Sequence, residues 1–217
     1  MKKNIWIIGF VVIFIGALAA MWFARSNTGT PSPNSVAKDE VVFTFGPDDH
    51  IKGNNEAKVT LVEFGDFQCP ACAAYSPVLM DVLKQNEGVL RIVYKHFPLI
   101  QIHLRAQAAA QASVAAGLQG KFWEMYVLLF DNQNEWASKT GTADFEKYAT
   151  QLGLDINKFK SDYNSDLVKD KISSDLKEAI DLGLNSTPTF YLNGKKIGNP
   201  KTIQEFNDLI KSAENSQ

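Results

Sequence analysis

The hydrophobic positions alternate along the chain between short apolar runs, typical of strands, and longer runs with helical spacing. Residues 59–64 and 90–97 are mostly apolar, which predicts two strands covered on both faces. Residues 187–197 combine an apolar run, the turn signal Asn193-Gly194 and a short partner strand, which predicts a hairpin. Residues 103–182 show helical spacing only. The pattern therefore predicts an α/β fold with an all-helical segment inserted between strands.

Two stretches complete the predicted elements. A β-like run at 41–45 precedes a polar loop at 46–57, in which we expect His50 to be solvated. A helix is predicted from Cys69 to about Gln85, and Pro77 should kink it.

The first 25 residues have the pattern of a membrane-targeting segment. Lys2 and Lys3 precede an uncharged run from Ile5 to Ala24, which would span about 30 Å as a helix and so match a bilayer core. Its length favours an uncleaved, single-pass anchor. The alternative is a signal peptide cleaved near Ala17-Leu18-Ala19, which would leave a secreted or periplasmic protein. The basic residues predict a cytoplasmic N-terminus, with the rest of the chain outside the cytoplasm.

Residues 26–40 are polar and interrupted by prolines, which predicts a linker.

Composition narrows the function classes. The chain has 217 residues, of which 45% are hydrophobic, so it can bury a sizeable core. The formal net charge is −2 and no stretch concentrates basic residues, so we expect no nucleic-acid partner.

The candidate chemistry lies in Cys69-Pro70-Ala71-Cys72, which follows the predicted strand and opens the next helix. The chain has no other cysteines. Two thiols at this spacing can close into a small disulfide and reopen, and the helix N-terminus favours the Cys69 thiolate. We expect no metal site, because zinc needs four ligands and the three histidines lack the required spacing. A purely structural disulfide is the alternative, although so small a loop would remove little unfolded-state entropy.

Glu63 is the candidate acid–base group. It lies within an apolar strand, so burial should raise the pKa of its carboxyl into a range that suits proton transfer. The alternative is an ordinary glutamate at the sheet edge, facing water. Lys95 in the next strand is a candidate charge partner for this acid. His103 begins the helical segment, and we assign it no chemistry.

These residues together resemble the DsbA-like branch of the thioredoxin-fold disulfide oxidoreductases. Glu63 lies six residues before Cys69, where the family carries a buried acid, and Pro77 lies where many members have a helix-kinking proline. Thr187-Pro188-Thr189 resembles the family's cis-proline loop, which packs beside the cysteines and binds extended substrates. The resemblance covers about residues 41–213.

The resemblance implies a domain arrangement and an activity. A thioredoxin-like domain would comprise residues 41–102 and 183–213, with an inserted helical domain at 103–182. The implied activity is thiol–disulfide exchange without a cofactor, most simply the oxidation of reduced secreted or membrane proteins. Recycling would fall to a quinone-linked membrane partner of the DsbB or VKOR type.

Two departures keep other functions open. Pro70 and Ala71, which tune the redox pair, lack the histidine that the best-known oxidases place there. Thr187 before the proline also occurs in isomerase-like and reductase-like members. A reductase or isomerase is therefore one alternative, and a non-catalytic binding or chaperone module is another. Residues 26–57 are too few for a separate dimerisation domain, which weakens the isomerase alternative, and we expect a monomer.

Overall fold

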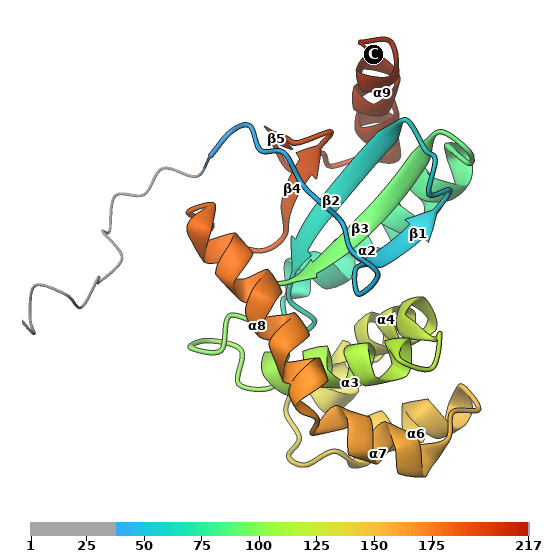
Figure 1. Ribbon diagram of the computed structural model, residues 1–217, viewed down its shortest axis with the longest axis vertical. Coiled ribbons are helices and arrows are strands. Elements are labelled where there is room, and N and C mark those ends of the chain that lie inside the picture. The colour runs from blue at the N-terminus through green and yellow to red at the C-terminus, as the bar shows by residue number, and fades with distance from the viewer. Residues whose placement is uncertain (1–37, 217) are drawn as a thin grey trace, which may run out of the picture. The chain divides into compact units, whose positions relative to one another are not determined.

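The computed structural model describes residues 38–216, which contain a five-stranded sheet and the helices that cover it (Figure 1). The predicted anchor at 1–25 and most of the linker lie outside the described residues. Within 38–216, no helix is both long enough and apolar enough to cross a membrane. The elements run in the order β1 (His50–Gly53), β2 (Val59–Gly65), α2 (Pro70–Gln85), β3 (Leu90–His96), α3 (Ala106–Gly117), α4 (Phe122–Asp131), α5 (Gln133–Trp136), α6 (Ala143–Gln151), α7 (Ile156–Tyr163), α8 (Asp166–Asp181), β4 (Thr189–Leu192), β5 (Lys195–Ile197) and α9 (Ile203–Glu214).

The strands lie in the order β1-β3-β2-β4-β5. The central pair, β2 and β3, is parallel, and every other pair is antiparallel. Because parallel strands end at the same edge of a sheet, the chain leaves β2 and β3 close together. The loop at residues 66–69, called the redox loop below, leads to the two cysteines at the start of α2, and it therefore meets the loop that leads into α3 at that edge.

The sheet has a separate apolar core on each face. Side chains alternate along a strand, so Leu61 of β2 packs among residues of α2 and α9, whereas Val62 and Phe64 pack against the end of α8. Figure 1 shows α8 and α2 on opposite sides of the sheet. The covering of both faces explains why the sequences of β2 and β3 are almost continuously apolar.

The helices from α3 to α8 all lie between β3 and β4 in the chain. Apart from α8, they gather beyond the end of the sheet (Figure 1). Their buried residues form a third core, which also takes in Phe67, both cysteines and Tyr94 from the sheet side. The redox loop is therefore packed between the sheet and the helices. The α/β fold with a helical segment between strands agrees with the prediction from the sequence.

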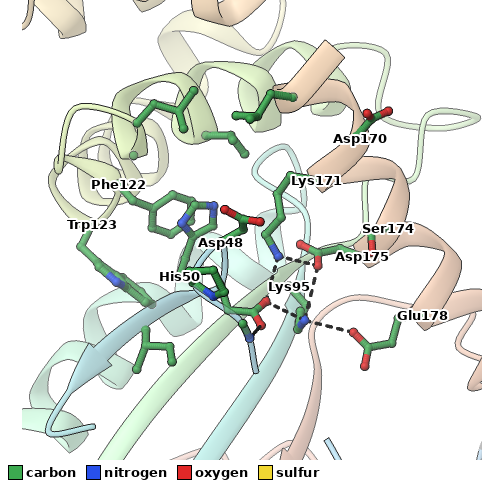
Figure 2. Close-up of a pocket in the computed structure, with 18 of the residues that line it drawn as sticks. Asp48, His50, Lys95, Phe122, Trp123, Asp170, Lys171, Ser174, Asp175 and Glu178 are labelled. Atoms are coloured by element: carbon green, nitrogen blue, oxygen red, sulfur yellow. Dashed lines mark hydrogen bonds and ion pairs between the residues drawn. The ribbon is translucent and has the colours of Figure 1, made fainter. Parts of the chain in front are cut away.

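A buried ion network joins α8 to the sheet. Lys95 on β3 pairs with Asp49 at 2.7 Å and with Glu178 at 3.1 Å, and Lys171 pairs with Asp49 at 2.9 Å and with Asp175 at 2.7 Å. Figure 2 shows both lysines beside Asp175, at the wall of a pocket of about 830 Å³. Burial alone would raise the pKa of Asp49, but hydrogen bonds from the two lysines outweigh it and lower that pKa to about 2.

This arrangement corrects the predicted pairing of Lys95 with Glu63. Lys95 aligns with Phe64 across the parallel ladder, whereas Glu63 aligns with Tyr94. Neighbours aligned in this way share one face of the sheet, so Lys95 and Glu63 point to opposite faces. Lys95 forms ion pairs with the acids of the ion network instead.

Two further predictions near the N-terminus are wrong. Residues 41–45 form no strand; their aromatic side chains pack on the sheet, and the segment is held by a hydrogen bond from Val41 N to Gly194 O. His50 is not a solvated loop residue, because it begins β1 and its ring stacks on Phe122 with centroids 3.6 Å apart. Burial, aided by the charge of Lys171, lowers the pKa of His50 to about 3, so its imidazole is neutral.

The ion network predicts a large stability loss on removal of one partner. Lys95→Met should lower the free energy of unfolding by about 3–5 kcal/mol, because it leaves buried carboxylates with too few cations. Chemical denaturation at pH 7 measures this loss. The matched control is Lys177→Met, which removes an exposed pair with Asp181 and should change stability by less than about 0.5 kcal/mol. Equal effects from the two variants would show that the network contributes no special stability.

Candidate active site

The two cysteines lie at the start of α2, immediately beyond the edge where β2 ends. Cys69 is the N-cap residue with an extended backbone (φ −73°, ψ 121°), and Pro70 occupies the first turn, where a missing N–H costs nothing. Cys72 lies one turn in and is fully buried, whereas Cys69 keeps 7% of its surface exposed. Both are free thiols in this structure. Cys69 is therefore the more accessible of the two thiols.

The pKa values of the two thiols move in opposite directions. A hydrogen bond from the Cys72 thiol lowers the pKa of Cys69 to about 5 against the opposing effect of burial, and the backbone N–H groups of Ala71 and Cys72 add to the lowering. Burial raises the pKa of Cys72 well above its usual value, and the same hydrogen bond raises it further. At neutral pH the site therefore presents a thiolate at Cys69 and holds Cys72 as a thiol.

Glu63 lies beneath this pair and is fully buried. Burial and, to a lesser extent, the charge of Cys69 raise the pKa of its carboxyl to about 8. A hydrogen bond from Tyr126 opposes this rise. The Tyr126 hydroxyl donates to Glu63 Oε2 at 3.3 Å. Glu63 also interacts electrostatically with Cys72. The structure thus places Glu63 in the buried environment that the sequence predicts; its role in proton transfer remains a prediction.

Thr187, which precedes Pro188, lies directly against Cys69. The peptide bond between Thr187 and Pro188 is cis, as the family resemblance implies. Cys69 Sγ lies 3.4 Å from the Thr187 carbonyl oxygen, to which it donates when Cys69 is protonated. β4 begins at the next residue and pairs with β2, which brings this loop back to the cysteines from more than a hundred residues away in the chain.

The loop before Cys69 is fixed by contacts that the sequence pattern does not predict. Asp66 is buried, and its carboxylate lies 2.8 Å from His103 Nδ1 and accepts the Leu99 N–H at 2.8 Å. Its other oxygen accepts the N–H of Gln68. His103 thus has a structural partner in the redox loop, although its position at the start of the helical segment gives no sign of it.

The helical segment also holds the loop before Cys69 in place through hydrogen bonds. The Gln133 amide of α5 donates to the carbonyl oxygens of Phe67 at 2.8 Å and of Cys69 at 3.0 Å. The Gln68 side chain accepts from Arg105 N and donates to Ala137 O. These contacts join segments far apart in the sequence, and single polar residues in helices give no pattern from which to predict them.

The large pocket of Figure 2 is separate from this chemistry, because neither cysteine lines it. Within the described part of the chain, no group of three or more His, Cys, Asp or Glu side chains could hold a metal ion. The thiols, Glu63 and the proline loop are therefore the chemically distinctive groups of the site.

Comparison with known proteins identifies the class. A family model described as thioredoxin matches residues 46–212, so the chain belongs to the thioredoxin family. The structure of Wolbachia pipientis alpha-DsbA1 superposes with a TM-score of 0.69 at 22% identity, over 78% of this chain and 92% of that one. The thiol-disulfide oxidoreductase MdbA of Corynebacterium diphtheriae gives a TM-score of 0.61 at 19% identity, over 76% and 89%. The chain therefore shares its fold with these structures, and its place in the thioredoxin family confirms the thioredoxin-like fold that the resemblance implies.

A curated relative adds a different context. The Na(+)/H(+) antiporter NhaA 1 of Mycolicibacterium gilvum is 37% identical over 198 residues, which cover 89% of this chain and 31% of that protein. The chain thus spans about a third of the length of the curated relatives that it matches.

The burial of Glu63 predicts a pH-dependent stability. The folded protein keeps the Glu63 proton up to a pKa of about 8, whereas the unfolded chain releases it near 4.5. Stability should therefore fall as the pH rises through that window, by roughly 5 kcal/mol in total. Glu63→Gln should remove this loss, so its stability relative to wild type should increase from pH 5 to pH 8.

Denaturation of the reduced protein at several pH values measures this difference. Exposed Glu87 supplies the matched control, and Glu87→Gln should follow the wild-type profile. A constant difference between Glu63→Gln and wild type across the range would show that Glu63 ionises as an ordinary carboxyl.

Proposed function

We propose that the protein is an extracytoplasmic disulfide oxidase that introduces disulfide bonds into secreted or membrane proteins through Cys69 and Cys72. The observation that carries the proposal is the placement of the two thiols, with Cys69 at the N-cap of α2 and partly exposed and Cys72 fully buried one turn further on. This placement lowers the pKa of Cys69 to about 5 and raises that of Cys72. A stable Cys69 thiolate favours the dithiol form, and this makes the disulfide form a better oxidant.

The first step would be attack by a client thiolate on Cys69 of the oxidised pair. A client–Cys69 bond forms, the Cys69–Cys72 bond breaks, and Cys72 leaves with the electron pair. Because the pKa of Cys72 is raised, its thiolate needs a proton, and Glu63 with a pKa of about 8 is a suitable donor at neutral pH.

The second step would release the product. Another client thiolate attacks the client sulfur of the mixed disulfide, and Cys69 leaves as its stable thiolate. The client gains a disulfide, and the enzyme gains two electrons as a dithiol. Thr187 and Pro188 would hold the client backbone beside Cys69, since this loop already contacts the thiol.

An apolar loop beside the site supports a protein client. Ile100, Ile102 and Leu104 are exposed, with 84% of the Leu104 surface accessible, and the last two line a groove of about 610 Å³ that also includes Gln68. Exposed apolar side chains of this kind mark interaction sites, and an unfolded client offers apolar segments to cover them.

The cellular setting of the proposal rests on the N-terminal sequence. A single-pass anchor at residues 1–25, with a cytoplasmic N-terminus and a linker at 26–40, would hold the domain outside the cytoplasm, where disulfides persist. By analogy with the family, a quinone-linked membrane protein of the DsbB or VKOR type would reoxidise the pair. The antiporter activity named for the curated relatives belongs to proteins about three times as long, so it does not enter this proposal.

A reductase is the second candidate, and the dipeptide Pro70-Ala71 favours it. This dipeptide brings no cationic side chain to the thiols, so one contribution to thiolate stability is missing. The direction of electron flow then depends on whether the hydrogen bonds to Cys69 are enough by themselves to stabilise its thiolate.

The order of events predicts which cysteine forms the mixed disulfide. Cys72→Ala should accumulate client disulfides through Cys69, because the escape thiol is absent, whereas Cys69→Ala should accumulate none. Non-reducing gels of the two variants after exposure to a reduced client measure this. Equal trapping by both variants would overturn the assignment of Cys69 as the nucleophile.

The reduction potential decides between the two candidates. About 30 mV corresponds to roughly 1.4 kcal/mol, and thioredoxin and DsbA lie near −270 and −120 mV. Because hydrogen bonds still lower the pKa of Cys69 while no cationic side chain lies between the thiols, we expect roughly −130 to −200 mV. The reduced protein should then melt at a higher temperature than the oxidised one. A potential near that of thioredoxin, with a more stable oxidised form, would support the reductase instead.

A further inference from the structure

We infer that Tyr126 is a positioning residue of the redox site, which reaches from the helical segment to hold the Glu63 carboxyl for proton exchange with Cys72. This inference rests on the proposed thiol–disulfide function. It assigns a chemical contribution to the helices inserted between β3 and β4, beyond their packing against the sheet.

The hydrogen bonding of Glu63 is unusually sparse for a buried carboxyl. The Tyr126 hydroxyl donates to Oε2 at 3.3 Å, and Oε1 has no hydrogen-bond partner among residues 38–216. Lys95, which the sequence offered as a charge partner for Glu63, lies on the other face of the sheet. The hydroxyl of Tyr126 is therefore the one side-chain donor that the described residues offer to this acid.

The position of that hydroxyl is fixed by aromatic packing. Tyr126 lies on α4 and is fully buried. Its ring centroid lies 4.8 Å from Phe130, 5.0 Å from Trp123 and 5.8 Å from Phe67. A ring enclosed in this way has little freedom, so the hydroxyl is held at the acid rather than reaching it by chance.

The chemical consequence follows from which form of the acid the hydroxyl favours. A donor stabilises the carboxylate, so it opposes the burial that favours the neutral acid. The titratable groups that interact with Glu63 are Cys69 at the N-cap of α2, Cys72 within α2, Tyr94 of β3 and Tyr126 itself. All of these can only be neutral or negative, so Tyr126 is the group that keeps the carboxylate accessible near neutral pH.

Tyr94 provides a matched comparison in the same cluster. It aligns with Glu63 across the β2–β3 ladder and is equally buried, but its hydroxyl has no hydrogen-bond partner within the described chain. Tyr94→Phe and Tyr126→Phe therefore remove the same atom from neighbouring sites, and only the second breaks a hydrogen bond to the acid.

The test is an infrared titration of the reduced full chain, in which the C=O stretch of the protonated carboxyl is assigned by its absence in Glu63→Gln. In wild type the band should disappear with a midpoint near pH 8. In Tyr126→Phe the midpoint should rise by about one pH unit, the effect of losing one hydrogen bond to a charged group. Tyr94→Phe should titrate like wild type. Unchanged titration in Tyr126→Phe, or equal shifts in both variants, would overturn the inference.

A second substitution guards against loss of folding in Tyr126→Phe. Incorporation of a fluorinated tyrosine at position 126 keeps the ring and makes the hydroxyl a stronger donor, so the midpoint should fall below that of wild type. A midpoint that does not move, or that rises, would contradict the inference.

A kinetic measurement links the titration to the chemistry. The rate at which Cys72 displaces glutathione from a Cys69 mixed disulfide should follow the same midpoints, with Tyr126→Phe about tenfold slower than wild type at pH 7. Infrared shifts without any oxidation of clients would refute the proposed function and leave the role of Tyr126 standing. Client oxidation with an unshifted titration in Tyr126→Phe would leave the proposed function standing and refute the role of Tyr126.

Discussion

The parallel pairing of β2 with β3 is the constraint on which the rest of the site depends. It brings the carboxyl ends of two strands to one edge of the sheet, so the redox loop after β2 meets the loop that leads into the helices after β3. The hydrogen bonds between Asp66 and the Leu99–His103 loop are the direct result of that meeting. The antiparallel return of β4 then adds the Thr187–Pro188 loop from the other side.

Burial acts on three ionisable groups at this edge with different results. It raises the pKa of Glu63 and of Cys72, because neither has enough donors to offset the loss of water. At Cys69 the hydrogen bonds from Cys72 and from backbone N–H groups outweigh burial, and the pKa falls. One small cluster therefore holds a thiolate at Cys69, a thiol at Cys72 and a carboxyl at Glu63 with a pKa of about 8. Stepwise proton and electron transfer requires pKa values that are separated in this way.

The helices inserted between β3 and β4 do more than cover the sheet. They supply the Gln133 amide to two carbonyls of the redox loop and the Tyr126 hydroxyl to Glu63. On the opposite face, α8 is joined to β3 through the buried ions around Lys95. Changes in the packing of the helices would therefore reach the thiols through hydrogen bonds, without contact between the helices and a client.

The sequence by itself determined the elements whose signals are local. Strand patterns, the Asn193-Gly194 turn and the two thiols at the start of a helix all depend on residues close in the chain, and the burial of Glu63 followed from its apolar strand. Tertiary structure decided which side chains meet. Register placed Lys95 on the face opposite Glu63, pairing turned the expected loop around His50 into β1, and packing brought Asp66 to His103 and Tyr126 to Glu63. Such contacts join single residues across long sequence separations, and they are selected by the geometry of the whole fold because no periodic pattern encodes them.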